Sequence, residues 1–304
     1  MKWEDHHTHV EIALPADFSF QECLRFLGRS DQELVYTINE GHLYKLLKID
    51  TAFILCDITH KENVLHVQFS NEVPTFAVKQ EVVSFISEWL DLDRDLTAFY
   101  HLASQDEILH KLVVRYQGLR MIRIPDLFEA LTWAIIGQQV NLTFAYKLKK
   151  RLTEMYGEHR TFRDKRYWLF PDPASIAELT VDELRGLQLS RRKAEYIIYV
   201  AALIRDGQLT KAELGKRMYD SVKKSLVAIR GIGNWTADYV LMKCLGRSEA
   251  FPIADVGLHN AIKVQLGLHE KPALKQIEMM ATKWEGWQAY ATFYLWRSLY
   301  DEQV

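Results

Sequence analysis

The sequence of 304 residues has little glycine, little proline and no long apolar run. Its 14 glycines and 7 prolines are too few for a collagen-like or low-complexity chain. The longest apolar stretches, such as residues 132–136, fall far short of the roughly 18 residues that a membrane-spanning helix needs. Residues 1–11 are charged and rich in histidine, unlike the apolar centre of a secretory signal. We therefore expect a folded, cytoplasmic protein that does not insert into a membrane.

Cysteine is scarce as well, because Cys23, Cys56 and Cys244 are an odd number and lie far apart. They form neither a disulfide framework nor the closely spaced set that zinc or an iron–sulfur cluster requires. The histidines of residues 6–9 are the other candidate ligands for a metal. No pattern of partner carboxylates accompanies them, so we interpret this segment as a solvated tail. The sequence thus predicts a reduced protein without a metal site made of side chains.

Charge is distributed unevenly along the chain, although the net charge is only -2. Residues 1–120 contain 11 Lys and Arg against 19 Asp and Glu, whereas residues 121–304 contain 27 against 21. An acidic first part and a basic second part indicate two modules, and only the second is suited to approach phosphates. An excess of this size is also typical of an ordinary solvated surface, so charge alone identifies no partner.

Short β-type runs dominate the first hundred residues. Residues 34–36, 43–47, 51–57 and 64–70 alternate apolar and polar side chains with the period of two that half-buried strands show. The connections between them are short and polar, so consecutive strands should pair antiparallel. An apolar stripe over residues 82–90 then has the spacing of an amphipathic helix. These features predict an antiparallel α/β module over residues 1–108.

From about Asp95 onward the β signal almost disappears, and one helical pattern follows another. Asp126 has a glutamate three residues later, and so does Thr180, which is the pattern of residues that begin a helix. The sequence therefore predicts a helical core over residues 109–304. The predicted fold class is α+β and predominantly helical.

Residues 226–239 are the most informative segment. An apolar helical turn ends at Ile229, a loop with Gly231 and Gly233 follows, and Asn234 is placed to cap a second helix, which is the order of a helix–hairpin–helix. Glycines remove the Cβ atoms that would keep a phosphate away, and unpaired N–H groups at a helix start attract it. Such a loop binds a nucleic-acid backbone without reading its sequence. A Gly-x-Gly by itself is also compatible with an ordinary helical turn.

A proline-containing loop, residues 251–258, follows the hairpin and presents Asp255 before a new helix. The order of hairpin, helix, Gly/Pro-containing loop and aspartate resembles the HhH-GPD superfamily of DNA glycosylases. Within it, the layout of nearly the whole chain resembles the AlkA type, DNA-3-methyladenine glycosylase II. The resemblance implies a helix–hairpin–helix glycosylase core with two helical subdomains that flank an active-site cleft. It extends to residues 128–130, 137–141, 169–171, 286–290 and 294–296.

The resemblance implies that Asp255 is catalytic, because the aspartate of this loop is the essential residue of the family. Breaking an N-glycosidic bond develops positive charge on the sugar, and a desolvated carboxylate stabilises that charge. A base that alkylation has already made cationic leaves without a general acid. The other role open to Asp255 is to cap the following helix.

Trp235 stands where family members that also cut the DNA strand have a lysine that attacks the sugar. The resemblance therefore implies a monofunctional N-glycosylase without AP lyase activity. Trp235, Tyr239 and Trp296 match positions that line the base-binding cleft of the family, where they would stack on a flipped, electron-poor purine.

The resemblance also implies a set of contacts with DNA. Gln138 and Gln139 would fill the gap left by the flipped nucleotide, although the bacterial prototype has an apolar residue where Gln139 aligns. An ordinary polar position in a helix is the alternative. The carbonyl groups of Ile229 and Gly231 would hold a Na⁺ or K⁺ ion. The residues that would contact the DNA backbone are Ile229, Gly231, Gly233, Asn234 and Thr236.

The resemblance thus implies an enzyme of base excision repair that removes alkylated purines, such as 3-methyladenine and 7-methylguanine, from double-stranded DNA. It implies no organic cofactor, and we expect a monomer. An oxidised-purine glycosylase of the 8-oxoguanine type is one alternative, disfavoured by the missing hairpin lysine. A non-catalytic helix–hairpin–helix DNA-binding protein is the other, and it would not need Asp255.

Overall fold

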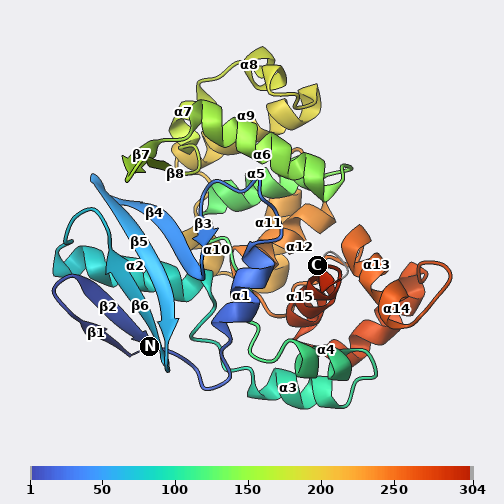
Figure 1. Ribbon diagram of the computed structural model, residues 1–304. Coiled ribbons are helices and arrows are strands. Elements are labelled where there is room, and N and C mark those ends of the chain that lie inside the picture. Colours follow the sequence, from blue (N-terminus) through green and yellow to red (C-terminus); the bar gives the residue numbers. More distant parts are fainter. Residues whose placement is uncertain (1, 302–304) are drawn as a thin grey trace.

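The computed structural model describes residues 2–301 and has a sheet in its first part and mainly helices in its second (Figure 1). All neighbouring strands of the sheet pair antiparallel, in the order β1-β2-β6-β5-β4-β3. Its inner face is apolar, as Val10 and Ile12 are fully buried, and it packs against α2 (Phe76–Trp89). The strands are β1 (Trp3–Asp5), β2 (His9–Ala13), β3 (Thr37–Asn39), β4 (His42–Ile49), β5 (Ala52–Lys61) and β6 (Val64–Phe69).

The strand predicted over residues 34–36 is wrong, whereas the three predicted runs that follow it correspond to β4, β5 and β6. The Glu33 carboxylate accepts hydrogen bonds from the N–H groups of Leu34 and Val35, at 2.9 and 3.1 Å. The buried ammonium of Lys45 donates a hydrogen bond to the Val35 carbonyl at 2.9 Å. Side chains therefore satisfy the backbone groups that a sheet would otherwise pair, and β3 begins only at Thr37.

The histidine-rich N-terminus is not a solvated tail, so that prediction is also wrong. The turn between β1 and β2 is closed by the His6 N–H, which donates to the His9 carbonyl at 3.0 Å. Buried Lys79 of α2 donates to the carbonyls of His6 and His7 at 3.0 and 3.1 Å. The alternation of histidine, valine, glutamate and isoleucine over residues 9–12 is the signal that could have revealed β2.

The second part confirms a predominantly helical protein. Asp126 begins α5 by accepting the Glu129 N–H at 2.6 Å, and Thr180 begins α8 with a capping box, both as predicted. Within residues 2–301, none of the helices is both long and apolar enough to cross a membrane. Besides α1 (Phe20–Leu27) in the first part, the helices are α3 (Thr97–Ser104), α4 (Leu109–Arg115), α5 (Leu127–Gly137), α6 (Leu142–Tyr156), α7 (Pro173–Ala177), α8 (Val181–Gly186), α9 (Arg191–Arg205), α10 (Lys211–Gly215), α11 (Tyr219–Val227), α12 (Asn234–Lys243), α13 (Val256–Gln265), α14 (Leu274–Ala281), α15 (Gln288–Ser298) and the 3-10 turn η1 (Thr282–Trp284).

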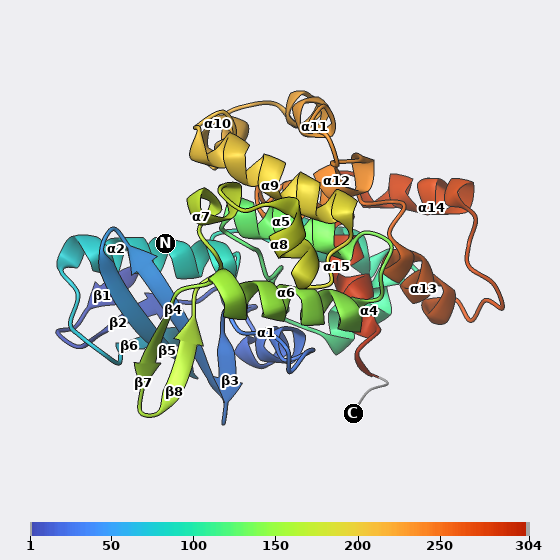
Figure 2. The ribbon, with the colours of Figure 1, turned by 90° about the horizontal axis from the view of Figure 1, so that it is seen from above.

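A second hairpin, β7 (His159–Phe162) and β8 (Lys165–Trp168), interrupts the helices and is missing from the sequence-based prediction. It lies beside β4 and β5 in both ribbon views (Figures 1 and 2). Leu46, Leu55 and Tyr167 form a small apolar cluster between it and the sheet. Only Tyr167 of these two strands is buried, and the exposed lysines and arginines give little of the apolar and polar alternation that predicts a strand.

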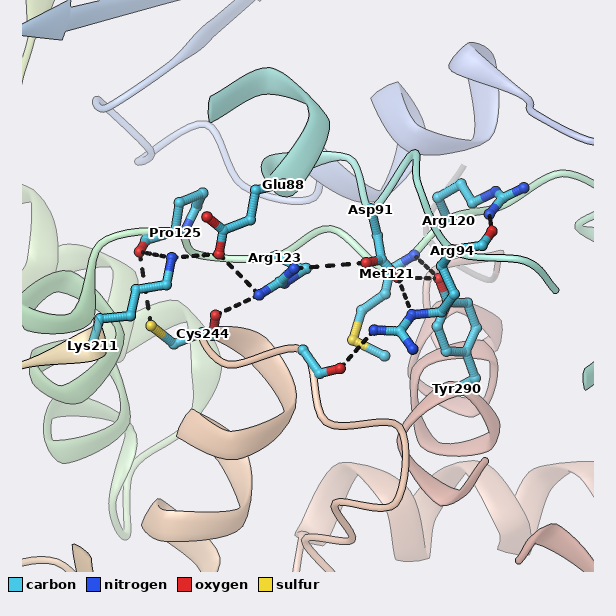
Figure 3. A network of polar contacts seen from close by, with 11 residues as sticks. Glu88, Asp91, Arg94, Arg120, Met121, Arg123, Pro125, Lys211, Cys244 and Tyr290 are labelled. Atoms are coloured by element: carbon cyan, nitrogen blue, oxygen red, sulfur yellow. Dashed lines mark hydrogen bonds and ion pairs between the residues drawn. The ribbon is translucent and has the colours of Figure 1, made fainter. Parts of the chain in front are cut away.

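A network of ion pairs and hydrogen bonds joins the two parts (Figure 3). The Glu88 carboxylate of α2 accepts from Arg123 at 2.9 Å and from Lys211. Arg123 also donates to the Cys244 carbonyl at 2.6 Å, directly after α12. The network therefore attaches the C-terminal end of α12 to the sheet-containing part. The division predicted between residues 108 and 109 stays a prediction.

Candidate active site

The hairpin between α11 and α12 depends on one glycine for its shape. Gly231 has φ +95°, and a Cβ atom there would lie 2.2 Å from the Tyr196 ring of α9. Gly233 is exposed, and among residues 2–301 no atom outside Gly233 and its two chain neighbours lies within 4 Å of where its Cβ would be. Gly233 is also the N-cap of α12, so the prediction that Asn234 caps this helix is wrong. The exposed N–H groups of the first turn have no intrahelical acceptor and are available to an anion.

Gln138 and Thr236 hold the hairpin in place and do not project from it. The Gln138 amide donates to the Gly231 carbonyl and to the Thr236 hydroxyl, each at 3.0 Å. The side chain of Thr236 is buried, so a contact with the DNA backbone would involve its N–H group, and that contact stays a prediction. The Gln138 amide is engaged within the protein, and its insertion into DNA likewise stays a prediction. Gln139 is exposed with φ +54° at the end of α5, and its role as the inserted residue stays a prediction.

Both carbonyl groups of the predicted Na⁺ or K⁺ site at the hairpin already accept a hydrogen bond within the protein. The Ile229 carbonyl accepts the Ile232 N–H at 3.0 Å, and the Gly231 carbonyl accepts the Gln138 amide. A carbonyl oxygen has two lone pairs, so each oxygen keeps one for a cation. The ion itself stays a prediction.

Asp238 connects the two helices of the hairpin, a role that the sequence analysis misses. Its buried carboxylate accepts from the Tyr219 hydroxyl at 2.8 Å and pairs with Lys223 at 2.9 Å, both from α11. Burial raises the pKa of Asp238, and these two donors offset part of that effect. An acidic residue inside the apolar sequence of α12 is the signal that could have pointed to this contact.

Asp255 is both a helix cap and the centre of a cluster of indole groups. As N-cap of α13, its Oδ1 accepts the Leu258 N–H at 2.7 Å. The same oxygen accepts the indole N–H of Trp296 at 2.7 Å, and Oδ2 accepts that of Trp235 at 3.0 Å. All three of these groups are donors, which is the environment of an ionised carboxylate. Both roles that the sequence left open for Asp255 are thus compatible with one geometry.

Gly257 gives the indole of Trp296 access to this carboxylate, and the sequence analysis misses it. A Cβ at position 257 would lie 2.9 Å from Asp255 Oδ1 and 3.3 Å from Trp296 Nε1. Contacts this short would displace the hydrogen bond between the two side chains. A glycine in the first turn of a helix, two residues after its acidic cap, is the sequence signal for such a close approach.

The four residues predicted for catalysis and base binding come together in the structure. The Tyr239 ring lies between the two indoles, with its centroid 5.7 Å from that of Trp235 and 6.0 Å from that of Trp296. Tyr239 is buried, whereas both tryptophans and Asp255 are partly exposed. A cavity that Tyr239 helps to line has a volume of about 40 Å³, enough for water but too small for a purine. Trp235, Trp296 and Asp255 are thus the members of the cluster that are partly exposed to an approaching base.

A helix–hairpin–helix with free N–H groups, followed by a carboxylate among aromatic rings, defines the class of helix–hairpin–helix base-excision proteins. The chain belongs to the HhH-GPD superfamily of base excision DNA repair proteins, whose family model matches residues 132–288. The model of the 8-oxoguanine DNA glycosylase N-terminal domain matches residues 8–131. The two family-model matches meet within helix α5, between residues 131 and 132, and therefore inside the helical part.

Named relatives span the whole chain. A DNA-3-methyladenine glycosylase of Bacillus subtilis is 41% identical over 99% of this chain and 100% of its own length. The structure of a 3-methyladenine DNA-glycosylase from Archaeoglobus fulgidus has a TM-score of 0.82 at 24% identity, over 96% of this chain and 98% of that one. A Clostridium acetobutylicum 8-oxoguanine glycosylase/lyase in complex with DNA has a TM-score of 0.78 at 20% identity, over 100% and 99%. The last two, at these identities, establish the fold alone.

Proposed function

We propose that this protein is a monofunctional DNA glycosylase that releases alkylated purines from double-stranded DNA in base excision repair, as a monomer in the cytoplasm. The observation that carries the proposal is the Asp255 carboxylate, held by the indole N–H groups of Trp235 and Trp296 beside the hairpin. The full-length similarity to a DNA-3-methyladenine glycosylase supports the choice of substrate.

Asp255 acts on the sugar of the flipped nucleotide. As the N-glycosidic bond lengthens, positive charge develops at the anomeric carbon, and the fixed carboxylate stabilises it electrostatically. Its two indole partners come from α12 and α15, so the carboxylate does not need to reorient during the reaction. The electron pair of the broken bond leaves with the base, so a cationic base departs neutral. Water then forms a bond to the anomeric carbon and releases a proton to solvent, which leaves a sugar hydroxyl.

The aromatic rings select the leaving group. Trp235 and Trp296 offer partly exposed indole faces, which attract an electron-poor or cationic ring. No hydrogen-bond pattern of one base is required for such stacking, so several alkylated purines fit. Cationic 3-methyladenine and 7-methylguanine leave more readily than neutral hypoxanthine, because a neutral purine needs a proton as it departs.

The hairpin holds the DNA backbone near the lesion. The exposed turn at Gly233 and Asn234 presents the N–H groups at the start of α12 to a phosphate. Gln139 is exposed at the neighbouring end of α5 and enters the gap left by the flipped nucleotide. Damage is thus recognised by extrusion and stacking, without reading of the surrounding sequence.

An oxidised-purine glycosylase is the second candidate, favoured by the match of residues 8–131 to the 8-oxoguanine glycosylase N-terminal domain. A strand-cutting mechanism of this class needs an amine that forms a Schiff base with the sugar. The side chain at the corresponding position is Trp235, whose indole N–H is bound to Asp255. Borohydride treatment of the enzyme with damaged DNA should therefore trap no covalent adduct.

The deciding experiment measures release of free bases from methylated duplex DNA under single-turnover conditions. We expect release of 3-methyladenine and 7-methylguanine, slower release of hypoxanthine, and a loss of about 10²–10³ in rate for Asp255→Asn. Because Asp255 also caps α13, circular dichroism and binding of abasic DNA serve as controls for folding of the variant. Faster release of hypoxanthine than of 3-methyladenine, or full activity of Asp255→Asn, would contradict the proposal.

A further inference from the structure

Three potential metal ligands meet at the hairpin of β1 and β2. His9 and Glu11 project from the outer face of β2, because Val10 and Ile12 between and beside them fill the core. His6 lies in the turn that precedes the strand. Both imidazoles approach the Glu11 carboxylate through Nε2, each at 3.8 Å. The ligand atoms of His6, His9 and Glu11 all lie within 4.8 Å of one another.

We propose that His6, His9 and Glu11 form a binding site for one divalent transition-metal ion, such as Zn²⁺. Tetrahedral Zn²⁺ with bonds of about 2.1 Å separates its ligand atoms by roughly 3.4 Å. The two separations of 3.8 Å run to different oxygens of Glu11, and the three ligand atoms lie within 4.8 Å of one another, so side-chain rotations must bring them closer to hold one ion. Water or the nearby Glu4 carboxylate, 4.0 Å from His6 Nε2, completes the coordination.

The backbone that carries these ligands is held in place before any metal binds. The Lys79 ammonium is buried and donates to the carbonyls of His6 and His7, and it pairs with Asp5 at 2.6 Å. The His9 ring is stacked between His6 and His66, with centroid distances of 4.4 and 4.1 Å. The turn and the ring plane of His9 are thus fixed by contacts that do not use the ligand atoms.

A second observation that points to a ligand is a ring nitrogen of His6 that lacks a hydrogen-bond partner. The His6 Nε2 is shielded from solvent and has no hydrogen-bond partner among residues 2–301. A shielded polar atom without a partner is unfavourable and rare in native proteins. A metal ion at this place would give the nitrogen the partner that it lacks.

Two imidazoles and one carboxylate favour Zn²⁺, Ni²⁺ or Cu²⁺ over Mg²⁺ and Ca²⁺, which prefer all-oxygen sites. The three cysteines are buried and do not compete for the ion. β1 and β2 lie on the side of the molecule away from α13, which Asp255 caps (Figures 1 and 2). The ion would therefore join the turn to β2 and stabilise this hairpin, without a part in the reaction.

The test uses the full-length protein without a histidine tag, freed of metal by a chelator. Zn²⁺ titration by calorimetry should show one equivalent bound, and Zn²⁺ should raise the melting temperature reversibly. Glu11→Gln keeps the shape of the side chain and His9→Ala removes a ligand, and each should weaken Zn²⁺ binding at least about tenfold. His7→Ala is the matched control, because His7 is exposed in the same turn and is not one of the three ligands.

Unchanged Zn²⁺ binding in Glu11→Gln and His9→Ala would overturn the proposal. So would an equal loss in His7→Ala, which would indicate nonspecific binding to the histidine-rich turn. Failure of the metal-free protein to bind one equivalent of Zn²⁺ at micromolar concentration would also overturn it. Circular dichroism of the three variants without metal verifies that each retains the sheet.

Discussion

At the scale of single residues, the central feature is a carboxylate held by donors from three separate places. Asp255 accepts from the backbone of its own helix, from Trp235 of α12 and from Trp296 of α15. A charged hydrogen bond fixes orientation more strongly than a neutral one. Under the proposed function, the two tryptophans would serve the reaction in two ways, through their N–H groups toward Asp255 and through their ring faces toward the base.

Trp296→Phe separates these two contributions. Phenylalanine keeps an aromatic face but loses the donor to Asp255 Oδ1, so the carboxylate is less well oriented. A hydrogen bond to a charged group is worth roughly 1.5–3 kcal/mol, so we expect a single-turnover rate at least about tenfold lower. Affinity for DNA that contains a cationic lesion should change less than in Trp296→Ala, which also loses the stacking surface. An unchanged rate in Trp296→Phe would show that orientation by the indole N–H is unimportant.

The two neighbouring glutamines have different surroundings, although the sequence suggests the same role for both. We expect Gln139→Ala to lower base release several-fold and leave the melting temperature unchanged, because Gln139 is exposed. Gln138→Ala should lower the melting temperature, since it leaves the Gly231 carbonyl and the Thr236 hydroxyl without their donor. Thermal unfolding and single-turnover release, measured on both variants, give the comparison. Equal effects of the two variants on both measurements would contradict this division.

At the scale of elements, the hairpin is a rigid turn built on the surface of α9. Gly231 lies against the Tyr196 ring, Gln138 ties the turn to α5, and Asp238 ties α12 to α11. Lys193 of α9 also donates to the Ile136 carbonyl of α5 at 2.8 Å. The exposed residues of the hairpin include Arg230, Gly233 and Asn234, which remain accessible to DNA under the proposed function.

Gly231→Ala and Gly233→Ala form a matched pair that tests this description. The first should destabilise the protein by roughly 2 kcal/mol or more, because φ is +95° and the added Cβ overlaps the Tyr196 ring. The second should change stability by less than about 0.5 kcal/mol, since φ is -90° and the added Cβ has open space. It should still weaken DNA binding, because the methyl group faces the phosphate. Urea unfolding and DNA affinity measure both effects, and equal destabilisation by the two variants would contradict the prediction.

At the scale of the whole molecule, the sheet-containing part and the helical core share buried charges. Lys243 at the end of α12 is buried between the rings of Phe26 from α1 and Phe293 from α15, and it donates to the Ile122 carbonyl. Burial lowers the pKa of Lys243 well below its ordinary value, and nearby Arg29 and Arg123 lower it further. The charged form of this side chain is thus disfavoured in the folded protein.

The pH dependence of stability should reveal this buried lysine. Above the lowered native pKa and below about 10.4, the unfolded chain binds a proton that the native protein has lost, so stability rises with pH. Lys243→Met fits the same space without a charge and should remove this rise, with higher stability at the lower end of the range. Lys243→Arg keeps a charge that cannot be lost and should destabilise throughout. Urea unfolding from pH 6 to 9 measures all three proteins, and parallel curves for wild type and Lys243→Met would contradict the prediction.

The sequence by itself determined the features that depend on near neighbours in the chain. The helix starts at Asp126 and Thr180, the turn at Gly231 and the loop that presents Asp255 each involve a few consecutive residues, so their backbone conformation is encoded locally. The family resemblance extended these motifs to the pocket residues, which composition and spacing alone would not have selected.

Only the tertiary structure decided the features that depend on partners far away in the chain. Gln138 is an anchor because the Gly231 carbonyl, 93 residues later, lies beside its amide. Residues 34–36 are not a strand because Glu33 and Lys45 bond their backbone, and residues 6–9 are ordered because Lys79 holds their carbonyls. For Gln138 and Lys79 the partner is distant in the sequence, and for residues 34–36 the neighbour Glu33 acts together with Lys45, which lies ten residues beyond Val35. Local sequence patterns do not encode such partners, since folding alone brings the two groups together.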